Sequence, residues 1–126
     1  MGKGNKKKAQ RYDLEERLID FSLQIIRVVE ELPNTRVGNH IANQLVRSGT
    51  SPAANYGEAQ SSESRNDFIH KMKLVLKELR ETRVWLLIIQ RKALIKPAEH
   101  LSLVLTENDE LISIFVASIA TTKKNN

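Results

Sequence analysis

The chain has 126 residues and no cysteine, so it can bury the core of one domain and cannot form disulfide bonds or thiolate metal sites. Hydrophobic residues make up 40% and charged residues 28%, a balance typical of a folded domain and not of a disordered segment. The longest strongly apolar run, residues 84–89, is far shorter than the ~20 residues that cross a bilayer, and no apolar stretch follows the first lysines. We therefore expect a cytoplasmic protein without a secretory signal or a membrane partner.

The formal net charge of +5 is concentrated at the two ends of the chain. Residues 12–122 hold 13 bases against all 15 acids. The first eleven residues hold bases and no acid: Lys3, Lys6, Lys7, Lys8 and Arg11. Attraction to the phosphates of RNA or DNA is therefore expected to begin with the tails. Two interpretations of the N-terminal bases stay open, a sequence-independent phosphate contact or a solubilising tail.

The first predicted elements are a basic arm and an amphipathic helix. Residues 1–12 lack a hydrophobic period and are rich in Lys, Gly and Asn, which predicts a disordered basic arm. Asp13 can then cap a helix whose apolar residues recur at spacings of four and three over residues 14–32. Pro33 ends this helix because proline cannot continue it.

A second helix is expected to begin within residues 35–39. Its middle is a run of small side chains, residues 48–54, interrupted by Pro52. Proline lacks a backbone donor and clashes with the preceding turn, so we expect a kink there, or a restart of the helix capped by Thr50 or Ser51.

The third predicted helix has the strongest apolar period in the chain. Ser64 and Asp67 favour its first turn, and apolar positions then repeat strictly at four and three over residues 68–89. Near the C-terminal end the stripe broadens to almost the whole circumference. The single tryptophan, Trp85, lies there and is interpreted as an anchor in the core or at a subunit interface.

A fourth apolar stripe covers residues 101–119, after a boundary at Lys96 and Pro97. Four helices joined by short connections predict an all-α protein, an antiparallel up-down-up-down four-helix bundle. The bundle is expected to occupy residues 13–122 and to be followed by a polar tail at residues 123–126.

We expect no catalytic, metal-binding or cofactor-binding residues. A carboxylate-bridged metal site in a bundle needs Glu-x-x-His on each of two helices, and only Asp67 with His70 approximates that spacing. Serines and threonines cluster at helix ends and in the small-residue run, where capping and close packing explain them. The sequence also lacks the strand-to-helix glycine loop that holds phosphates in nucleotide-binding enzymes.

The segment RSGTSPAANYGEAQ, residues 47–60, has more small side chains than an ordinary bundle helix needs. Small residues let another helix approach closely, while Asn55 and Glu58 place polar groups beside that contact. These groups either pair with the third helix or form a functional surface. The first interpretation predicts hydrogen bonds to Arg80, Glu81 or Arg83.

This segment, followed after a serine-rich turn by DFIHKMKLVLKELRETRVWL, resembles the small four-helix-bundle proteins encoded in intervening sequences of bacterial 23S ribosomal RNA genes. The resemblance covers residues 14–120 and is most specific over residues 47–86. The motif positions, for which packing or interface roles are expected, are Arg47, Gly49, Pro52, Asn55, Glu58, Asp67, Phe68, Glu81 and Trp85.

The resemblance implies a ring-shaped homopentamer. It also implies kinship with accessory proteins of diversity-generating retroelements, which use a basic pentameric surface to bind nucleic acid and a reverse transcriptase. This chain differs from those relatives in its near-neutral bundle. The apolar excess of the third helix fits burial against a neighbouring copy, and five copies would present their N-terminal bases together.

The leading hypothesis is a non-enzymatic, homo-oligomeric bundle that binds RNA or DNA weakly through its basic tails. It would serve as an accessory or scaffold for a reverse transcriptase or another nucleic-acid-processing protein. The alternative is a protein-protein interaction module in which nucleic acid plays no part. A metal-dependent enzyme is the third hypothesis.

Overall fold

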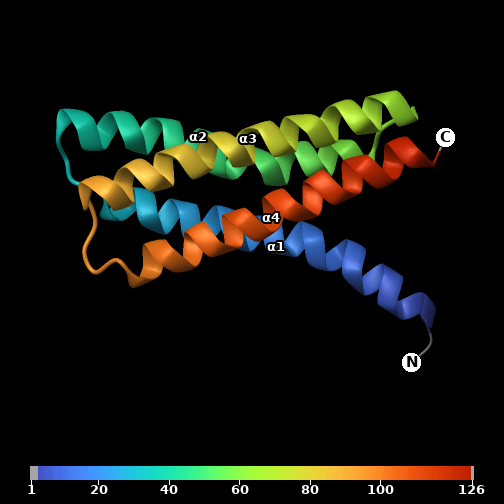
Figure 1. Cartoon of the computed structure of the whole chain (residues 1–126), viewed down its shortest axis with the longest axis horizontal. Helices are drawn as coiled ribbons and strands as arrows, with labels where there is room; N and C mark the ends of the chain where they lie inside the picture. The colour runs from blue at the N-terminus through green and yellow to red at the C-terminus, as the bar shows by residue number, and fades with distance from the viewer. Residues whose placement is uncertain (1–2, 126) are drawn as a thin grey trace.

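The computed structural model describes residues 3–125, with side chains from residue 14 onward, and this part of the chain contains four helices and no strand. The helices are α1 (Lys3–Glu31), α2 (Arg36–Gln60), α3 (Arg65–Lys92) and α4 (Glu99–Lys124) (Figure 1). The predicted all-α class is therefore confirmed for these residues. None of the four helices is both long and apolar enough to cross a membrane.

The chain reverses direction at each of its three connections (Figure 1). Contacts between helices show the same arrangement. Glu58, near the end of α2, pairs with Lys71 near the start of α3, whereas Arg47 in the middle of α2 pairs with Glu81, ten residues farther along α3. Between α3 and α4, Arg65 reaches the carbonyl oxygen of Thr122 at 3.0 Å. Such partners occur only where neighbouring helices run in opposite directions.

Local capping explains where α2 and α3 begin. The hydroxyl of Thr35 accepts a hydrogen bond from the backbone nitrogen of Gly38 at 3.0 Å, and that of Ser64 accepts one from Asp67 at 3.0 Å. The predicted start of the third helix is therefore confirmed. Gly38 is required at its position, because a Cβ there would lie 2.0 Å from the carbonyl oxygen of Pro33. α3 ends where Ala93 adopts a left-handed conformation, with φ of 54°.

Helix boundaries differ from the sequence-based expectation at both termini. α1 begins at Lys3, so helix occupies residues 3–12, where we expected a disordered arm, and Asp13 is not its N-cap. α4 likewise continues to Lys124, into the expected tail. Both extensions consist largely of residues with ordinary or good helix propensity and contain no proline. An apolar period locates the packed part of a helix and not its ends.

α2 continues without interruption through Pro52, so the predicted restart is wrong. Thr50 and Ser51 do not cap a new helix. Their hydroxyls donate instead to the carbonyl oxygens four residues earlier, of Val46 at 2.6 Å and of Arg47 at 2.5 Å. Pro52 itself is buried, and packing on its neighbours holds the turn in helical form despite the missing donor. The expected kink stays a prediction.

The core follows the apolar stripes that the sequence predicts. Its side chains form one cluster along the inner faces of the four helices. Large side chains that are fully buried in this cluster include Leu18, Phe21, Ile25, Leu45, Met72, Leu79, Leu86, Ile89, Leu101, Leu111 and Phe115. Among the polar residues of the stripes, Asn108 and Thr82 are fully buried, and the side-chain nitrogen of Asn108 donates to the carbonyl oxygen of Leu79 at 3.2 Å. The core is therefore shared by all four helices.

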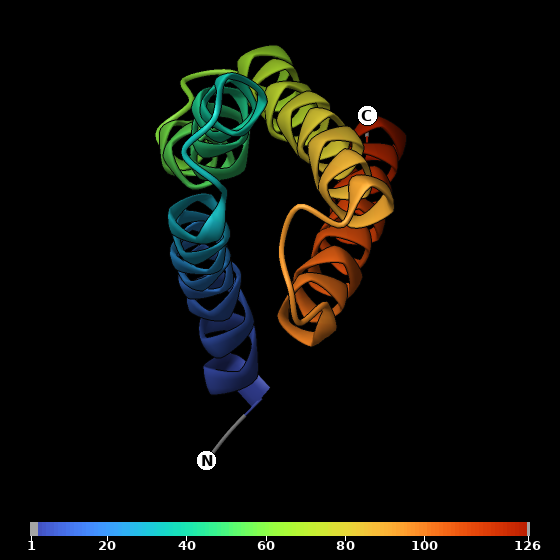
Figure 2. The ribbon, with the colours of Figure 1, turned by 90° about the vertical axis from the view of Figure 1, so that its left-hand side faces the viewer.

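α1 packs mainly on α2 and touches α4 lightly, and the two outer helices splay apart in the view along the bundle (Figure 2). A bidentate ion pair joins them: the Nε and Nη2 atoms of Arg17 lie 3.0 and 2.7 Å from the carboxylate of Glu107, and Nη2 also lies 2.9 Å from Glu110. The hydrogen bond to Glu107 raises the pKa of Arg17 despite an opposing effect of burial.

Candidate functional site

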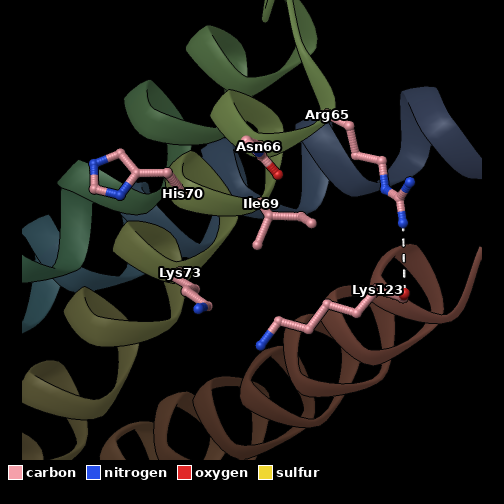
Figure 3. Close-up of a pocket in the computed structure, with 6 residues that line it drawn as sticks. All are labelled: Arg65, Asn66, Ile69, His70, Lys73 and Lys123. Atoms are coloured by element: carbon pink, nitrogen blue, oxygen red, sulfur yellow. Dashed lines mark hydrogen bonds between the residues drawn. The ribbon is translucent and has the colours of Figure 1, made fainter. Parts of the chain in front are cut away.

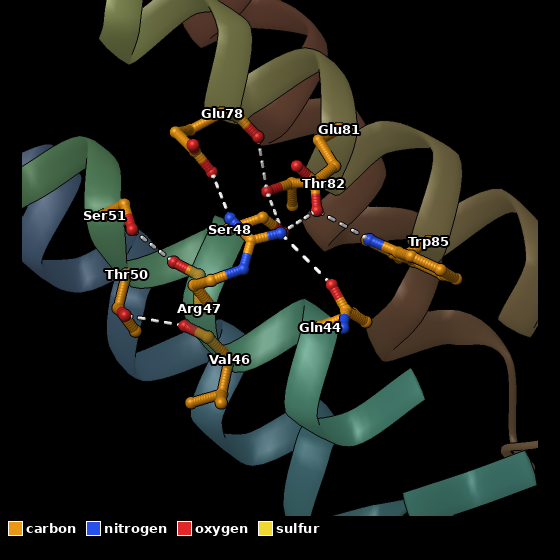
Figure 4. A network of polar contacts seen from close by, with 10 residues as sticks. All are labelled: Gln44, Val46, Arg47, Ser48, Thr50, Ser51, Glu78, Glu81, Thr82 and Trp85. Carbon is orange, nitrogen blue, oxygen red and sulfur yellow. Dashed lines mark hydrogen bonds and ion pairs between the residues drawn. The ribbon is translucent and has the colours of Figure 1, made fainter. Parts of the chain in front are cut away.

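Three of the nine motif residues, Arg47, Glu81 and Trp85, meet in one polar network on the seam between α2 and α3 (Figure 4). Arg47 is its centre. Its Nη1 atom donates to Glu78 at 3.1 Å, and its Nη2 atom donates to Gln44 at 3.2 Å and pairs with Glu81. The indole nitrogen of Trp85 donates to the same Glu81 carboxylate at 3.1 Å. Each of these charges is therefore compensated by a neighbour.

A buried pair of hydroxyls lies beneath this network. Ser48 and Thr82 are both fully buried, and their hydroxyl oxygens lie 2.9 Å apart. Thr82 also donates to the carbonyl oxygen of Glu78 at 2.8 Å, so its proton is committed to its own helix and it can accept one from Ser48. The two hydroxyl groups thus satisfy each other's need for a hydrogen bond, and the small size of both side chains lets the helices stay close together.

Trp85 anchors the seam from α3. It is half-buried, and its ring meets His40 of α2 edge to face, with centroids 5.9 Å apart. The hydrogen bond to Glu81 satisfies its only polar atom. The tryptophan thus ties the two helices together, in keeping with the predicted anchor role.

The two glycines of the motif have different surroundings. A Cβ on Gly49 would lie 2.6 Å from Cγ2 of Ile25, so α1 and α2 approach each other more closely there than any other residue allows. A Cβ on Gly57 would meet nothing within 4 Å. The expected close approach of helices is therefore confirmed at Gly49 and is wrong for Gly57 within this protomer.

The polar partners expected for Asn55 and Glu58 are wrong in detail. Glu58 does pair with α3, but with Lys71 at 3.0 Å and not with residues 80–83. The antiparallel register explains this, because it places the end of α2 beside the start of α3 and leaves Glu81 opposite Arg47. Asn55 is half-buried and its side chain forms no hydrogen bond within the described part of the chain.

Asp67 and Phe68 act at the start of α3. Asp67 is exposed in the first turn, where its negative charge interacts favourably with the helix dipole. Phe68 is partly buried against the core. These two motif positions are therefore accounted for by helix initiation and packing.

The N-terminal bases Lys3, Lys6, Lys7, Lys8 and Arg11 belong to the first turns of α1, and their side chains lie outside the described residues. The helix that carries them starts at the end of the molecule where α4 finishes and where α2 connects to α3 (Figure 1). Lys123 and Lys124 lie at that same end. Basic residues from both ends of the sequence are thus brought to one end of the bundle.

The requirements of a metal site are not met by the described side chains. Over residues 14–125 no group of three or more His, Asp or Glu side chains could hold a metal ion. His70 lines a hollow with Asn66 and Lys73 (Figure 3), and Asp67 is not among the residues that line it. Asp67 and His70, the residues whose spacing approximates the metal-binding pattern, belong to no such group among residues 14–125.

Sequence reasoning missed two features. The first is the central role of Arg47, which the acids Glu78 and Glu81 signal by facing α2 from adjacent turns. The second is a row of bases along α3: His70, Lys73, Lys77 and Arg80. Their spacings of three, four and three place them on one helical face, a pattern that appears once the period is applied to charged residues as well as apolar ones.

Comparisons with known proteins found a matching family model and a similar solved structure. A family model described as "23S rRNA-intervening sequence protein" matches residues 10–117. A solved structure from Bacteroides thetaiotaomicron, described as a protein with unknown function from the S23 ribosomal protein family, is 30% identical. The match covers 83% of this chain and 96% of that one, with a TM-score of 0.76. No curated protein matches the chain.

Proposed function

Because the chain belongs to the 23S rRNA-intervening sequence protein family, we propose that it is a non-enzymatic accessory or scaffold protein that assembles from identical copies and binds nucleic acid weakly. Its scaffold is an antiparallel up-down-up-down bundle. The observation that carries the proposal is the gathering of bases at one end of the molecule, from residues 3–11 and from the end of α4. Such a concentration of positive charge attracts phosphates in any sequence context.

Assembly from identical copies is supported by apolar side chains that face solvent on this protomer. Ile19, Leu23 and Ile26 form a row on α1, 41%, 60% and 37% exposed, at spacings that place them together and away from the core. Val84 and Ile88 form a second exposed pair on α3. Contiguous apolar rows on a bundle surface are commonly buried by another subunit. We propose the homopentamer of the family as the assembly that covers them.

The proposed partners are RNA or DNA and a nucleic-acid-processing protein such as a reverse transcriptase, and the proposed compartment is the cytoplasm. Five protomers would multiply the basic ends. Individually weak phosphate contacts would then add through effective concentration, which compensates for a bundle whose middle is nearly neutral.

The proposal is tested by removing the N-terminal charges. Binding of a fluorescent single-stranded RNA and of duplex DNA is measured by anisotropy at two salt concentrations, for the full chain and for Lys6→Gln/Lys7→Gln/Lys8→Gln. We expect weaker binding and a salt slope lower by about 2 on single strands, because about 0.7 is lost per phosphate contact. The matched control is Arg91→Gln/Lys92→Gln/Lys96→Gln, which removes three charges from the opposite end of the bundle.

Absence of binding by the full chain at low salt would sink the proposal. The alternative, a protein-protein interaction module without nucleic acid, would then be favoured, since the exposed rows on α1 and α3 suit a protein surface as well as a second copy. Recovery of a stoichiometric partner protein that survives nuclease treatment would support that alternative.

A further inference from the structure

The row of bases on α3, formed by His70, Lys73, Lys77 and Arg80, faces solvent throughout. Ten residues separate its ends, so it extends about 15 Å along the helix. Its neighbours on the same side of α3 are neutral, Asn66 and Val84. One face of α3 therefore presents a straight line of positive charge without an intervening acid.

Three members of this row, His70, Lys73 and Arg80, line two hollows that α3 shares with α4. The first has a volume of about 440 Å³ and is lined by Arg65, Asn66, Ile69, His70, Lys73 and Lys123 (Figure 3). The second has a volume of about 450 Å³ and is lined by Arg80, Arg83, Asp109, Ile112 and Ser113. We call this surface the α3–α4 seam. It is concave at both ends of the basic row.

Charge on the seam is largely uncompensated. Among residues 14–125, no acidic side chain forms an ion pair with Lys73, Lys77, Arg80 or Lys123. The one acid that lines either hollow, Asp109, is already paired with Arg83 at 2.9 Å. An added anion would therefore meet several free ammonium and guanidinium groups and little repulsion.

Lys73 and Lys123 come from different helices and converge on the first hollow (Figure 3). The ammonium group of Lys73 lowers the pKa of Lys123, because a second positive charge nearby disfavours the protonated form. Folding thus holds two cations close together at a point where no protein anion joins them. A phosphate between them would replace that repulsion by two attractive contacts.

We propose that the α3–α4 seam binds the phosphodiester backbone of a single-stranded nucleic acid, with Lys73 and Lys123 holding one phosphate and Lys77 and Arg80 holding those that follow. This inference rests on the proposed nucleic-acid function and moves its principal contacts from the N-terminal bases to the α3–α4 seam.

A single strand suits the surface better than a duplex. A positively charged groove that tracks one backbone is the usual design for single strands, and the two hollows make this seam concave. Ile112 lines the second hollow, and Val116, one turn farther along α4 on the same face, is exposed. These side chains offer apolar surface to a sugar or base. Neither hollow is lined by Phe, Tyr or Trp, so the binding is expected to be largely independent of sequence.

The test uses the full chain and a fluorescent 12-nucleotide RNA of mixed sequence, with anisotropy measured at low salt. Lys73→Gln/Lys123→Gln is compared with Lys92→Gln/Lys96→Gln, which removes the same charge from the opposite end of α3 and the loop that follows it. We expect the first variant to lose at least about tenfold more affinity than the control and to reduce the salt slope by about 1.4, the value for two phosphate contacts on a single strand.

Lys73→Arg/Lys123→Arg should keep most of the affinity, because it preserves both charges, and thermal unfolding monitors the fold of every variant. Equal losses in the seam variant and the control would overturn the inference while leaving the proposed function intact. A duplex of the same sequence that is bound as tightly and is as sensitive to the seam variant would overturn the single-strand assignment. A full chain that binds no RNA at low salt would overturn both proposals.

Discussion

Charged side chains of α3 form ion pairs on the side that faces α2, whereas the bases of the row that faces solvent form none among residues 14–125. Toward α2, Lys71 pairs with Glu58, and Glu78 and Glu81 surround Arg47, so nearly every charged group has a partner within hydrogen-bond distance. On the side open to solvent and α4, the basic row of His70, Lys73, Lys77 and Arg80 has no acidic partner among residues 14–125, and Lys123 lies beside Lys73. The same helix thus contributes charges that are neutralised at the seam with α2 and charges that are not neutralised at the α3–α4 seam.

This difference separates the requirements of folding from those of binding. Charges in the α2–α3 seam neutralise each other and leave nothing for a ligand, which makes the family motif chiefly a packing motif. Uncompensated charge on the α3–α4 seam contributes repulsion and no stability to the isolated chain, so a ligand is the simplest account of it. Substitutions on the two sides should therefore have different consequences.

The largest effect is expected where the small-residue segment packs most tightly. Gly49→Val would push a branched side chain into Ile25, whose Cγ2 atom lies 2.6 Å from the position of an added Cβ. We expect the free energy of unfolding to fall by about 3 kcal/mol, the upper range for overpacking in a well-packed core. Gly57→Val is the matched control, and its effect should stay within about 0.5 kcal/mol because the added group meets open space. Equal effects at both glycines would contradict the packing role of the segment.

Thr82→Val should be next in size. The substitution keeps the volume but leaves the buried hydroxyl of Ser48 without its partner 2.9 Å away. An unsatisfied buried hydroxyl costs about 2 kcal/mol, which urea unfolding can measure. Thr106→Val removes an exposed hydroxyl that donates only to the carbonyl oxygen four residues earlier, and it should change stability by less than about 0.5 kcal/mol. A small loss at Thr82 would mean that the seam depends on shape alone.

Arg47→Ala should destabilise the protein by about 1 kcal/mol, because its side chain is 48% exposed and its ion pairs are screened by water. The only tryptophan offers a more specific readout. Trp85 donates to the Glu81 carboxylate that Arg47 also holds, so the substitution should shift the emission of Trp85. Arg83→Ala breaks the exposed pair with Asp109 on the other side of α3 and should leave the emission unchanged. Identical spectra for both variants would remove Arg47 from the centre of the network.

The sequence was sufficient for the core and insufficient for the seams. Apolar spacing alone identified Met72, Leu79 and Leu86 as buried, because a helix of 3.6 residues per turn must bury its apolar stripe. The partner of Glu58 could not be predicted in this way, since it depends on how far α2 and α3 slide past each other. The start of α1 was also missed, because residues 3–12 carry no apolar period that would indicate a helix. The basic row on α3 was visible as a spacing, but its lack of acidic partners is known only from the fold.

The smallest expected effect has the opposite sign. Lys73→Gln removes a repulsion with Lys123, so the melting temperature at pH 7 and low salt should rise slightly, and the gain should disappear at high salt. The pKa of Lys123 is lower in the folded protein than in the unfolded chain, whose lysines titrate at about 10.4. As the pH rises, Lys123 therefore loses its proton first in the folded protein, and the repulsion with Lys73 disappears. The wild-type protein then becomes more stable relative to Lys73→Gln, and the difference in melting temperature between them should vanish in alkaline solution.

The control Lys92→Gln should instead lower the melting temperature slightly, because Lys92 lies in the last turn of α3, where a positive charge interacts favourably with the helix dipole. If Lys73→Gln also lowered the melting temperature, its charge would be stabilising, and the contrast between the two sides of α3 would fail.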